Sequence, residues 1–179
     1  MKTEPQPDTK DWTWVLRERC PECGFDTGES ARDDLAVLAR DVTDRWVAAM
    51  SVVGEPGERP EPAVWSPLEY ACHVRDVFEL ACVRLRLMLA EDAPRFANWD
   101  QDVAAIEDDY ASQDPGVVVG ELEVAGTAFA DLVATVPDDA WERPGLRGDG
   151  AAFTVDSFTR YLIHDPVHHL TDVTGVRWA

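Results

Sequence analysis

Near the C-terminus the chain reads Phe153-Thr-Val-Asp-Ser-Phe-Thr-Arg-Tyr-Leu-Ile-His-Asp-Pro-Val-His-His-Leu-Thr-Asp-Val173, and this stretch predicts one amphipathic helix. Thr154 is a suitable N-cap and Gly175 a suitable stop. Its apolar residues recur at steps of three and four, the pattern of a helix with one face in a core. The members of this stripe are Val155, Phe158, Leu162, Val173 and Val176.

Histidines interrupt the helix. Three of the four histidines of the chain, His164, His168 and His169, lie within six residues, and the fourth, His73, lies on another amphipathic stretch that begins at Trp65. Imidazole is the commonest metal-binding side chain, and two histidines four apart on a helix project about 40° from each other. A third ligand from a neighbouring helix would complete a three-ligand site with open positions, which is typical of a catalytic metal centre.

Two registers on this helix compete for the metal. In the first, His164 and His168 join His73, and ligand chemistry favours this set. In the second, Asp165 and His169 join His73, and the apolar stripe extrapolates through these positions. Sequence spacing alone leaves both registers open.

Pro166 complicates the choice, because a proline inside a helix removes the hydrogen bond to the carbonyl of Leu162. A π-type bulge there would bring His164 and His169 onto one face. In the second register, Asp172 would accept a ring N–H and orient the ligand. The predicted metal ligands are His73, His164 and His168, followed by His169.

Length and composition describe one globular domain. The chain has 179 residues, 45% of them hydrophobic, which is enough for a single core and short for two domains. Its net charge of −19 would repel phosphate backbones, so we expect no nucleic-acid partner. No apolar run reaches the length of a membrane span, and the polar N-terminus lacks the apolar core of a signal peptide. We therefore expect a cytoplasmic protein.

The residue mix, with only two lysines, resembles that of GC-rich bacteria such as actinobacteria.

Four cysteines raise a separate question. Cys20-Pro-Glu-Cys23-Gly is a knuckle of the kind that supplies half of a zinc site, but Cys72 and Cys82 lack the spacing of a second pair. The knuckle is therefore a turn with two free thiols, a disulfide, or half of a site completed from elsewhere. For a cytoplasmic protein we favour reduced thiols in a tight turn.

Three further amphipathic helices are predicted upstream. The clearest start is Ser66-Pro-Leu-Glu69, a capping box with proline at the first helical position. These helices and the C-terminal one predict an all-α four-helix bundle over residues 30–179, preceded by an N-terminal extension over residues 1–29 that carries the Cys-x-x-Cys knuckle. A short hairpin is considered between Trp141 and Phe153. The three upstream helices are expected over about 31–50, 67–90 and 116–136.

Two motifs carry a resemblance to a known family. Trp65-Ser-Pro-Leu-Glu-Tyr-Ala-Cys-His73 resembles the W-S-x-x-E-x-x-x-H opening of helix two in the DinB/YfiT-like metalloproteins, and His164 to Asp172 resembles their H-x-x-x-H motif in helix four. This superfamily includes the mycothiol-dependent maleylpyruvate isomerases. The resemblance, over about residues 30–176, implies a four-helix bundle with zinc or nickel held by three side chains, and a link to low-molecular-weight thiols such as mycothiol.

The leading hypothesis is a metal-dependent enzyme that acts on a small molecule or thiol, as a thiol S-transferase or isomerase. Arg75 and Arg160, near the two motifs, are candidates to bind a substrate carboxylate, although surface salt bridges are the more ordinary role. The alternative is a non-catalytic protein that binds a metal or small ligand in a stress response. A third hypothesis is a homodimer joined through the tryptophan-rich N-terminal segment.

Overall fold

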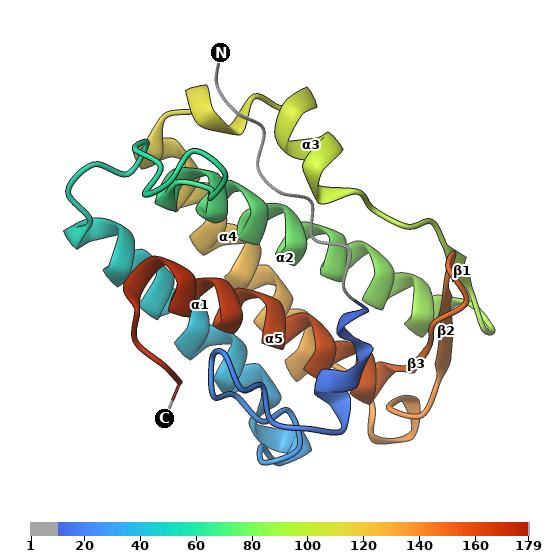
Figure 1. The fold of residues 1–179 in the computed structure, drawn as a ribbon. Helices are drawn as coiled ribbons and strands as arrows, with labels where there is room; N and C mark the ends of the chain where they lie inside the picture. Colours follow the sequence, from blue (N-terminus) through green and yellow to red (C-terminus); the bar gives the residue numbers. More distant parts are fainter. Residues whose placement is uncertain (1–10, 179) are drawn as a thin grey trace.

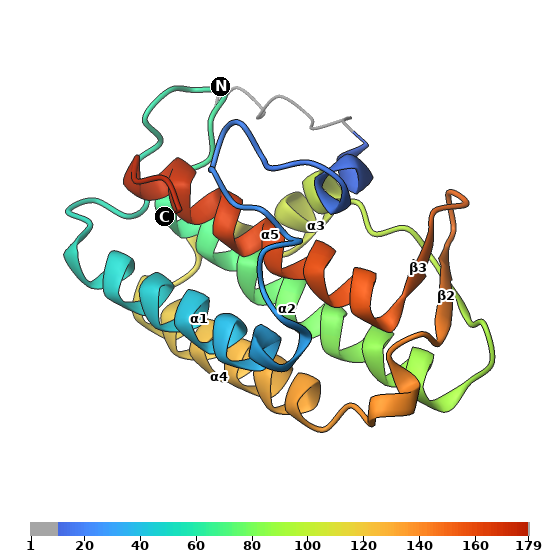
Figure 2. The same ribbon diagram turned by 90° about the horizontal axis from the view of Figure 1, so that it is seen from below.

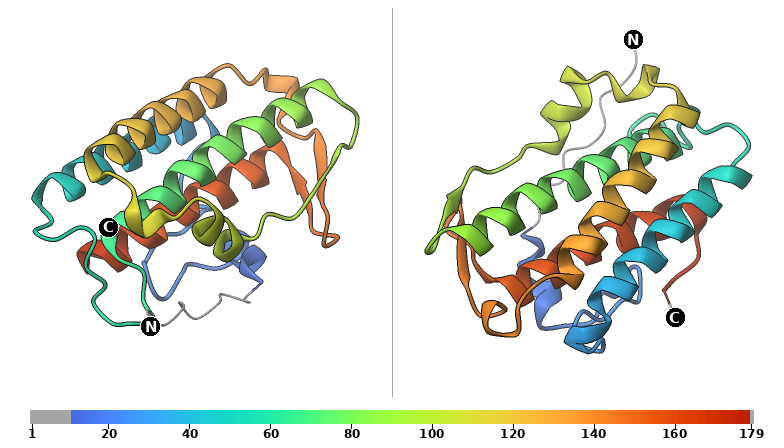
Figure 3. Two further views of the ribbon diagram at one scale, coloured as in Figure 1. Left: turned by 90° about the horizontal axis from the view of Figure 1, so that it is seen from above. Right: turned by 180° about the vertical axis from the view of Figure 1, so that it is seen from behind.

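Four long helices form the body of the protein. The structure is a computed structural model that describes residues 11–178 (Figure 1). Helices α1 and α2 follow each other in the chain but lie at opposite corners of the bundle, because α4 packs between them on one side and α5 on the other (Figure 3). The predicted all-α four-helix bundle is confirmed. The helices are α1 (Leu35–Val52), α2 (Pro67–Ala90), α4 (Pro115–Ala134) and α5 (Val155–Thr174).

Shorter elements close one end of the bundle. Strand β1 (Arg95–Phe96) pairs parallel with β2 (Pro144–Arg147), which pairs antiparallel with β3 (Ala152–Thr154). The hairpin considered between Trp141 and Phe153 therefore exists, whereas the two residues of β1 are too few for a sequence pattern to predict. A seven-residue helix, α3 (Gln101–Glu107), packs outside α2.

Helix ends follow the capping chemistry of the sequence. Ser66 and Glu69 form the predicted capping box at the start of α2, with their side chains bonded to each other's backbone N–H at 3.2 and 2.8 Å. Thr154 caps α5 and accepts a hydrogen bond from the N–H of Ser157 at 3.1 Å. Gly175 ends α5 with φ of +69°, in the left-handed region that glycine adopts without strain. These ends set where the histidines of α5 lie along the bundle.

Pro166 does not break α5, which is α-helical throughout Val155–Thr174 without a π turn. Its carbonyl oxygen accepts a 2.8 Å hydrogen bond from the indole nitrogen of Trp46, which is completely buried on α1. The π-type bulge considered at Pro166 is therefore absent from this helix, in which His164 and His169 do not share a face. The apolar stripe also ends earlier than predicted, because Val176 lies beyond Gly175 and is 69% exposed.

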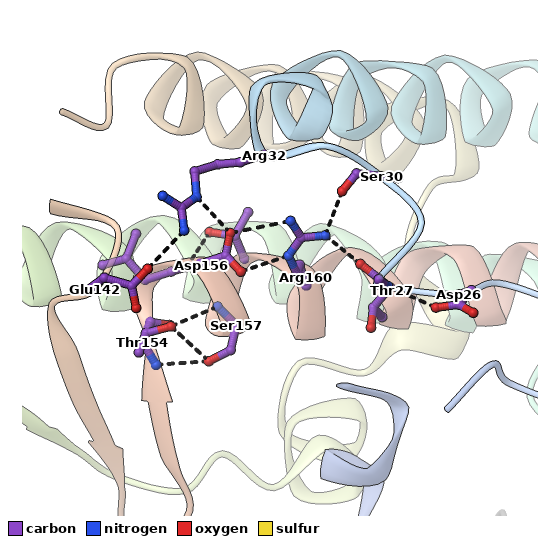
Figure 4. A network of polar contacts seen from close by, with 12 residues as sticks. Asp26, Thr27, Ser30, Arg32, Glu142, Thr154, Asp156, Ser157 and Arg160 are labelled. Carbon is purple, nitrogen blue, oxygen red and sulfur yellow. Dashed lines mark hydrogen bonds and ion pairs between the residues drawn. The ribbon is translucent and has the colours of Figure 1, made fainter. Parts of the chain in front are cut away.

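The N-terminal segment, which we define as residues 11–34, runs across α5 (Figure 2). Arg160 of α5 anchors it by donating hydrogen bonds to the carbonyl oxygens of Thr27 and Ser30, while Asp156 bonds both Arg160 and Arg32 (Figure 4). The expected extension over residues 1–29 lies partly outside the described residues, which begin at residue 11. Among the described helices, none is both long and apolar enough to cross a membrane.

Close packing between α1 and α4 predicts opposite effects for two glycines of α4. A Cβ at Gly126 would lie 2.2 Å from Oγ1 of the buried Thr43, whereas a Cβ at Gly120 meets nothing within 4 Å. Alanine favours a helix interior over glycine, so Gly120→Ala should raise the free energy of unfolding by about 0.5–1 kcal/mol. Gly126→Ala should lower it by about 1–3 kcal/mol through overpacking. Urea unfolding measures both, and equal shifts of the same sign would contradict this packing.

Candidate metal-binding sites

Helix α5 sends metal-ligating side chains in two directions. One group joins His73 of α2 with Asp165 and His169 of α5, and we call it the His–Asp–His cluster. The other joins Cys20 and Cys23 of the N-terminal segment with His164 and His168 of α5, and we call it the Cys–His cluster. Within each cluster one ligand atom per residue lies within 4.8 Å of all the others.

In the His–Asp–His cluster, the Asp165 carboxylate stands between two imidazoles. Its Oδ1 atom lies 3.1 Å from Nε2 of His73 and 3.9 Å from Nε2 of His169. The other ring nitrogen of His169, Nδ1, lies 2.8 Å from Oδ2 of Asp172. A carboxylate on that nitrogen fixes the ring orientation and points Nε2 into the cluster, as in many metal sites.

His73 owes its position to packing. Its ring is completely buried, stacks on Trp99 at 5.4 Å and 18°, and contacts Trp65 at 5.4 Å. Among the buried side-chain nitrogen and oxygen atoms of residues 11–178, its Nδ1 atom is the one that lacks a hydrogen-bond partner. Aromatic walls on both sides therefore hold the ring and direct Nε2 toward Asp165.

The donor set fits a divalent metal. Burial by itself would raise the pKa of Asp165, but its electrostatic and hydrogen-bond interactions with the neighbouring histidine rings outweigh that effect and bring the pKa well below its usual range. The carboxylate is therefore anionic at neutral pH. Two imidazoles and one carboxylate suit zinc and other first-row divalent ions, and three protein ligands leave coordination positions open.

One cavity is lined by two residues of this cluster, and a second lies beside Asp172. The first, of about 80 Å³, is lined by Trp12 of the N-terminal segment, Gln101 of α3 and Tyr161, together with the polar residues of α5. The Tyr161 hydroxyl accepts a 3.0 Å hydrogen bond from Arg147 of β2. The other, of about 370 Å³, lies beside Asp172, within the size range of small-molecule pockets. Asp165 and His169 thus border the smaller cavity, whereas Asp172, the partner of His169, borders the larger one.

In the Cys–His cluster all four side chains are buried. Cys20 Sγ lies 3.7 Å from Nδ1 of His168, and Cys23 Sγ lies 3.8 Å from Nε2 of His164. Burial lowers the pKa of His164 to about 4, so its ring is neutral, and burial raises the pKa of the Cys23 thiol to about 12.

The structure divides the four predicted ligands between the two clusters. His73 lies with Asp165 and His169, the second register, and not with the favoured pair His164 and His168. The reason is helical geometry: successive residues project about 100° apart, so positions 164 and 165 face different neighbours. Each of the four histidines belongs to one of the two candidate metal sites. Neither site contains His73 together with His164 and His168.

Other candidates have structural partners. Arg75 bonds Asp76, Gln113 and Glu121, and Arg160 bonds the N-terminal segment, so neither points into a cluster. Cys72 and Cys82 are buried thiols of α2 and belong to neither cluster.

The sequence did not predict the aromatic residue that packs against His164 and His168. Trp12 contacts the rings of His164 and His168 at 5.6 and 4.8 Å, and no motif marks it. The pairing of the cysteines with His164 and His168 had a signal, since Cys-x-x-Cys and His-x-x-x-His are the two halves of a Cys₂His₂ site.

Comparisons with known proteins agree with this architecture. The family model of the DinB superfamily matches residues 35–173. Among solved structures, YfiT from Bacillus subtilis, described as a probable metal-dependent hydrolase with an unusual four-helix bundle topology, is similar with a TM-score of 0.71 and 18% identity. The match covers 82% of this chain and 90% of YfiT.

A histidine-to-alanine variant of mycothiol-dependent maleylpyruvate isomerase is similar with a TM-score of 0.70 and 16% identity, over 84% of this chain and 64% of the isomerase. At these identities the two structures establish the fold alone. A comparison with curated proteins finds no match. Because the family model covers most of the chain, including both bundle motifs, the protein belongs to the DinB superfamily.

Proposed function

We propose that this protein is a divalent-metal-dependent enzyme whose catalytic metal, zinc or nickel, binds to His73, Asp165 and His169. The observation that carries the proposal is the convergence of these three ligand atoms within 4.8 Å at a cavity. A metal kept by three protein ligands has room for a substrate atom, which distinguishes a catalytic site from a closed structural one.

Each residue around the cluster has a role. A divalent ion bound here would favour the thiolate of a bound thiol or lower the pKa of a bound water toward neutrality. Asp172 fixes the ring of His169 through Nδ1. Trp12 and Gln101 wall the smaller cavity and limit the entry of water. The hydroxyl of Tyr161, bonded to Arg147, is placed to contact a substrate there.

For the substrate we propose a low-molecular-weight thiol such as mycothiol, in an S-transfer or isomerisation reaction. One structural neighbour is named for a mycothiol-dependent isomerase, which supports this class, while the other is named for probable hydrolysis. The cleft of about 370 Å³ beside Asp172 has the volume for the body of a small ligand. The alternative is a non-catalytic protein that binds metal or a small ligand in a stress response. The small volume of the cavity beside the cluster, about 80 Å³, favours this alternative.

His73→Ala tests the metal site itself. Loss of one of three ligands should remove about one equivalent of metal per chain, measured by mass spectrometry on untagged protein after dialysis. His169→Ala, whose side chain is more exposed, should do the same and guards against misfolding of the first variant. Cys82→Ser is the matched control, since it is buried on the same helix nine residues or about 13 Å away. Unchanged metal content in both histidine variants would refute the proposed ligands.

Asp172→Asn tests the orienting carboxylate. A weaker acceptor on Nδ1 of His169 should lower the metal affinity by about 10–100-fold, without lowering the amount bound at saturation. Competition with a chromophoric chelator gives the affinity. Asp131→Asn, which removes only a surface ion pair with Arg40, should leave it unchanged. Equal affinities for Asp172→Asn and the unaltered protein would show that this contact has no role in metal binding.

Thiol binding separates the enzyme from the non-catalytic alternative. Calorimetric titration of the metal-loaded protein with mycothiol should give heat that disappears in the His73→Ala variant, because the open metal position takes the thiolate. Turnover of thiol adducts then follows by chromatography. Full metal loading with neither thiol binding nor turnover would favour the non-catalytic protein.

Three further expectations stay predictions: a cytoplasmic location, a homodimer and the lack of a nucleic-acid partner. Light scattering would test the homodimer.

A further inference from the structure

The knuckle of the N-terminal segment has the form of a metal-binding turn. The N–H of Gly24 donates to the carbonyl oxygen of Cys20 at 2.9 Å, and the N–H of Cys20 donates to that of Phe25 at 2.8 Å. Gly24 has φ of +84°, and a Cβ there would lie 3.0 Å from the carbonyl oxygen of Trp178, so a larger residue would be strained there. This tight turn places both thiols on one side, where both are fully buried.

Across from the knuckle, α5 presents two imidazoles at matching positions. His164 and His168 are one turn apart, and each faces one thiol, with sulfur–nitrogen distances of 3.8 and 3.7 Å. In a tetrahedral zinc site, with Zn–S of about 2.3 Å and Zn–N of about 2.0–2.1 Å, neighbouring ligand atoms lie about 3.3–3.8 Å apart. A sulfur–nitrogen pair in that geometry is about 3.6 Å apart. The observed 3.8 and 3.7 Å are close to it, and all four ligand atoms lie within 4.8 Å of one another.

The ring of His168 is also oriented from its other side. Its Nε2 atom lies 3.4 Å from the carboxylate of Glu22, a residue between the two cysteines of the knuckle. A carboxylate in that position favours a proton on Nε2 and leaves the lone pair of Nδ1 directed at Cys20. The knuckle therefore supplies both the sulfur ligands and the group that sets the ligand form of one imidazole.

We propose that Cys20, Cys23, His164 and His168 bind one zinc ion in a closed, structural Cys₂His₂ site. Four protein ligands leave no open position, so this ion fastens the N-terminal segment to α5 and does not bind substrate. The site is separate from the His–Asp–His cluster, although the two share one turn of α5. Its zinc also fixes Trp12, which packs on both histidines of the site and lines the cavity of the other cluster.

Sulfur ligation distinguishes this site from the His–Asp–His cluster, which has no thiolate. Reduced full-length protein should carry about two divalent metal ions per chain, at least one of them zinc, and zinc-edge X-ray absorption should show a zinc–sulfur shell at about 2.3 Å. Replacement of zinc by cobalt should give thiolate-to-cobalt charge-transfer absorption in the near ultraviolet. The double variant Cys20→Ser/Cys23→Ser should lose this absorption and one zinc ion per chain. The matched control, Cys72→Ser/Cys82→Ser, should keep the absorption and that zinc ion.

The two metal sites can fail independently. His73→Ala should keep the zinc–sulfur shell and the charge-transfer band while losing the other ion, so failure of the proposed catalytic site would leave this result intact. Absence of a zinc–sulfur shell in the unaltered reduced protein would overturn the structural site without any variant. Persistence of the band in the double cysteine variant, or a cobalt spectrum without thiolate bands, would overturn it as well.

Discussion

Helix α5 carries two buried imidazoles, His164 and His168, and beside them the partly buried Asp165 and His169, and each of these side chains has a polar partner. An unpaired buried polar group costs about 1–3 kcal/mol, and a buried charge costs more. His164 and His168 meet the two cysteines of the knuckle, while Asp165 meets His73 and His169. A rotation of α5 by one residue, about 100°, would separate both sets at once. The rotation of this helix is therefore the constraint on which both clusters depend.

Several contacts hold that rotation. The indole of Trp46 donates to the carbonyl oxygen of Pro166, which lies between the ligand positions 164–165 and 168–169. Arg160 bonds two backbone carbonyl oxygens of the N-terminal segment, and its partly buried position makes these bonds worth more than an exposed ion pair. The caps at Thr154 and Gly175 set where the helix begins and ends along the bundle axis. Hydrogen bonds and packing together thus place the ligands before any ion binds.

The family match includes one of the two clusters completely and the other only in part. The DinB family model begins at residue 35, so it includes His73 and all of the α5 ligands but excludes Cys20 and Cys23. The His–Asp–His cluster therefore lies entirely within the bundle that the family shares. The Cys–His cluster joins that bundle to a segment outside the match, and the same segment brings Trp12 over the cavity beside the first cluster. A segment outside the family match thus lines the cavity beside the first cluster.

The sequence by itself determined the helices, the caps at Ser66 and Thr154, the stop at Gly175 and the family, because these depend on local spacing and on motifs. It also named all four histidines as candidate ligands. Only the tertiary structure decided how they are grouped, since residues 164 and 165 are adjacent in the chain yet face different elements, one the knuckle and the other α2. The partners come from segments more than 90 residues away, and a helical repeat states which residues share a face but not what lies opposite that face.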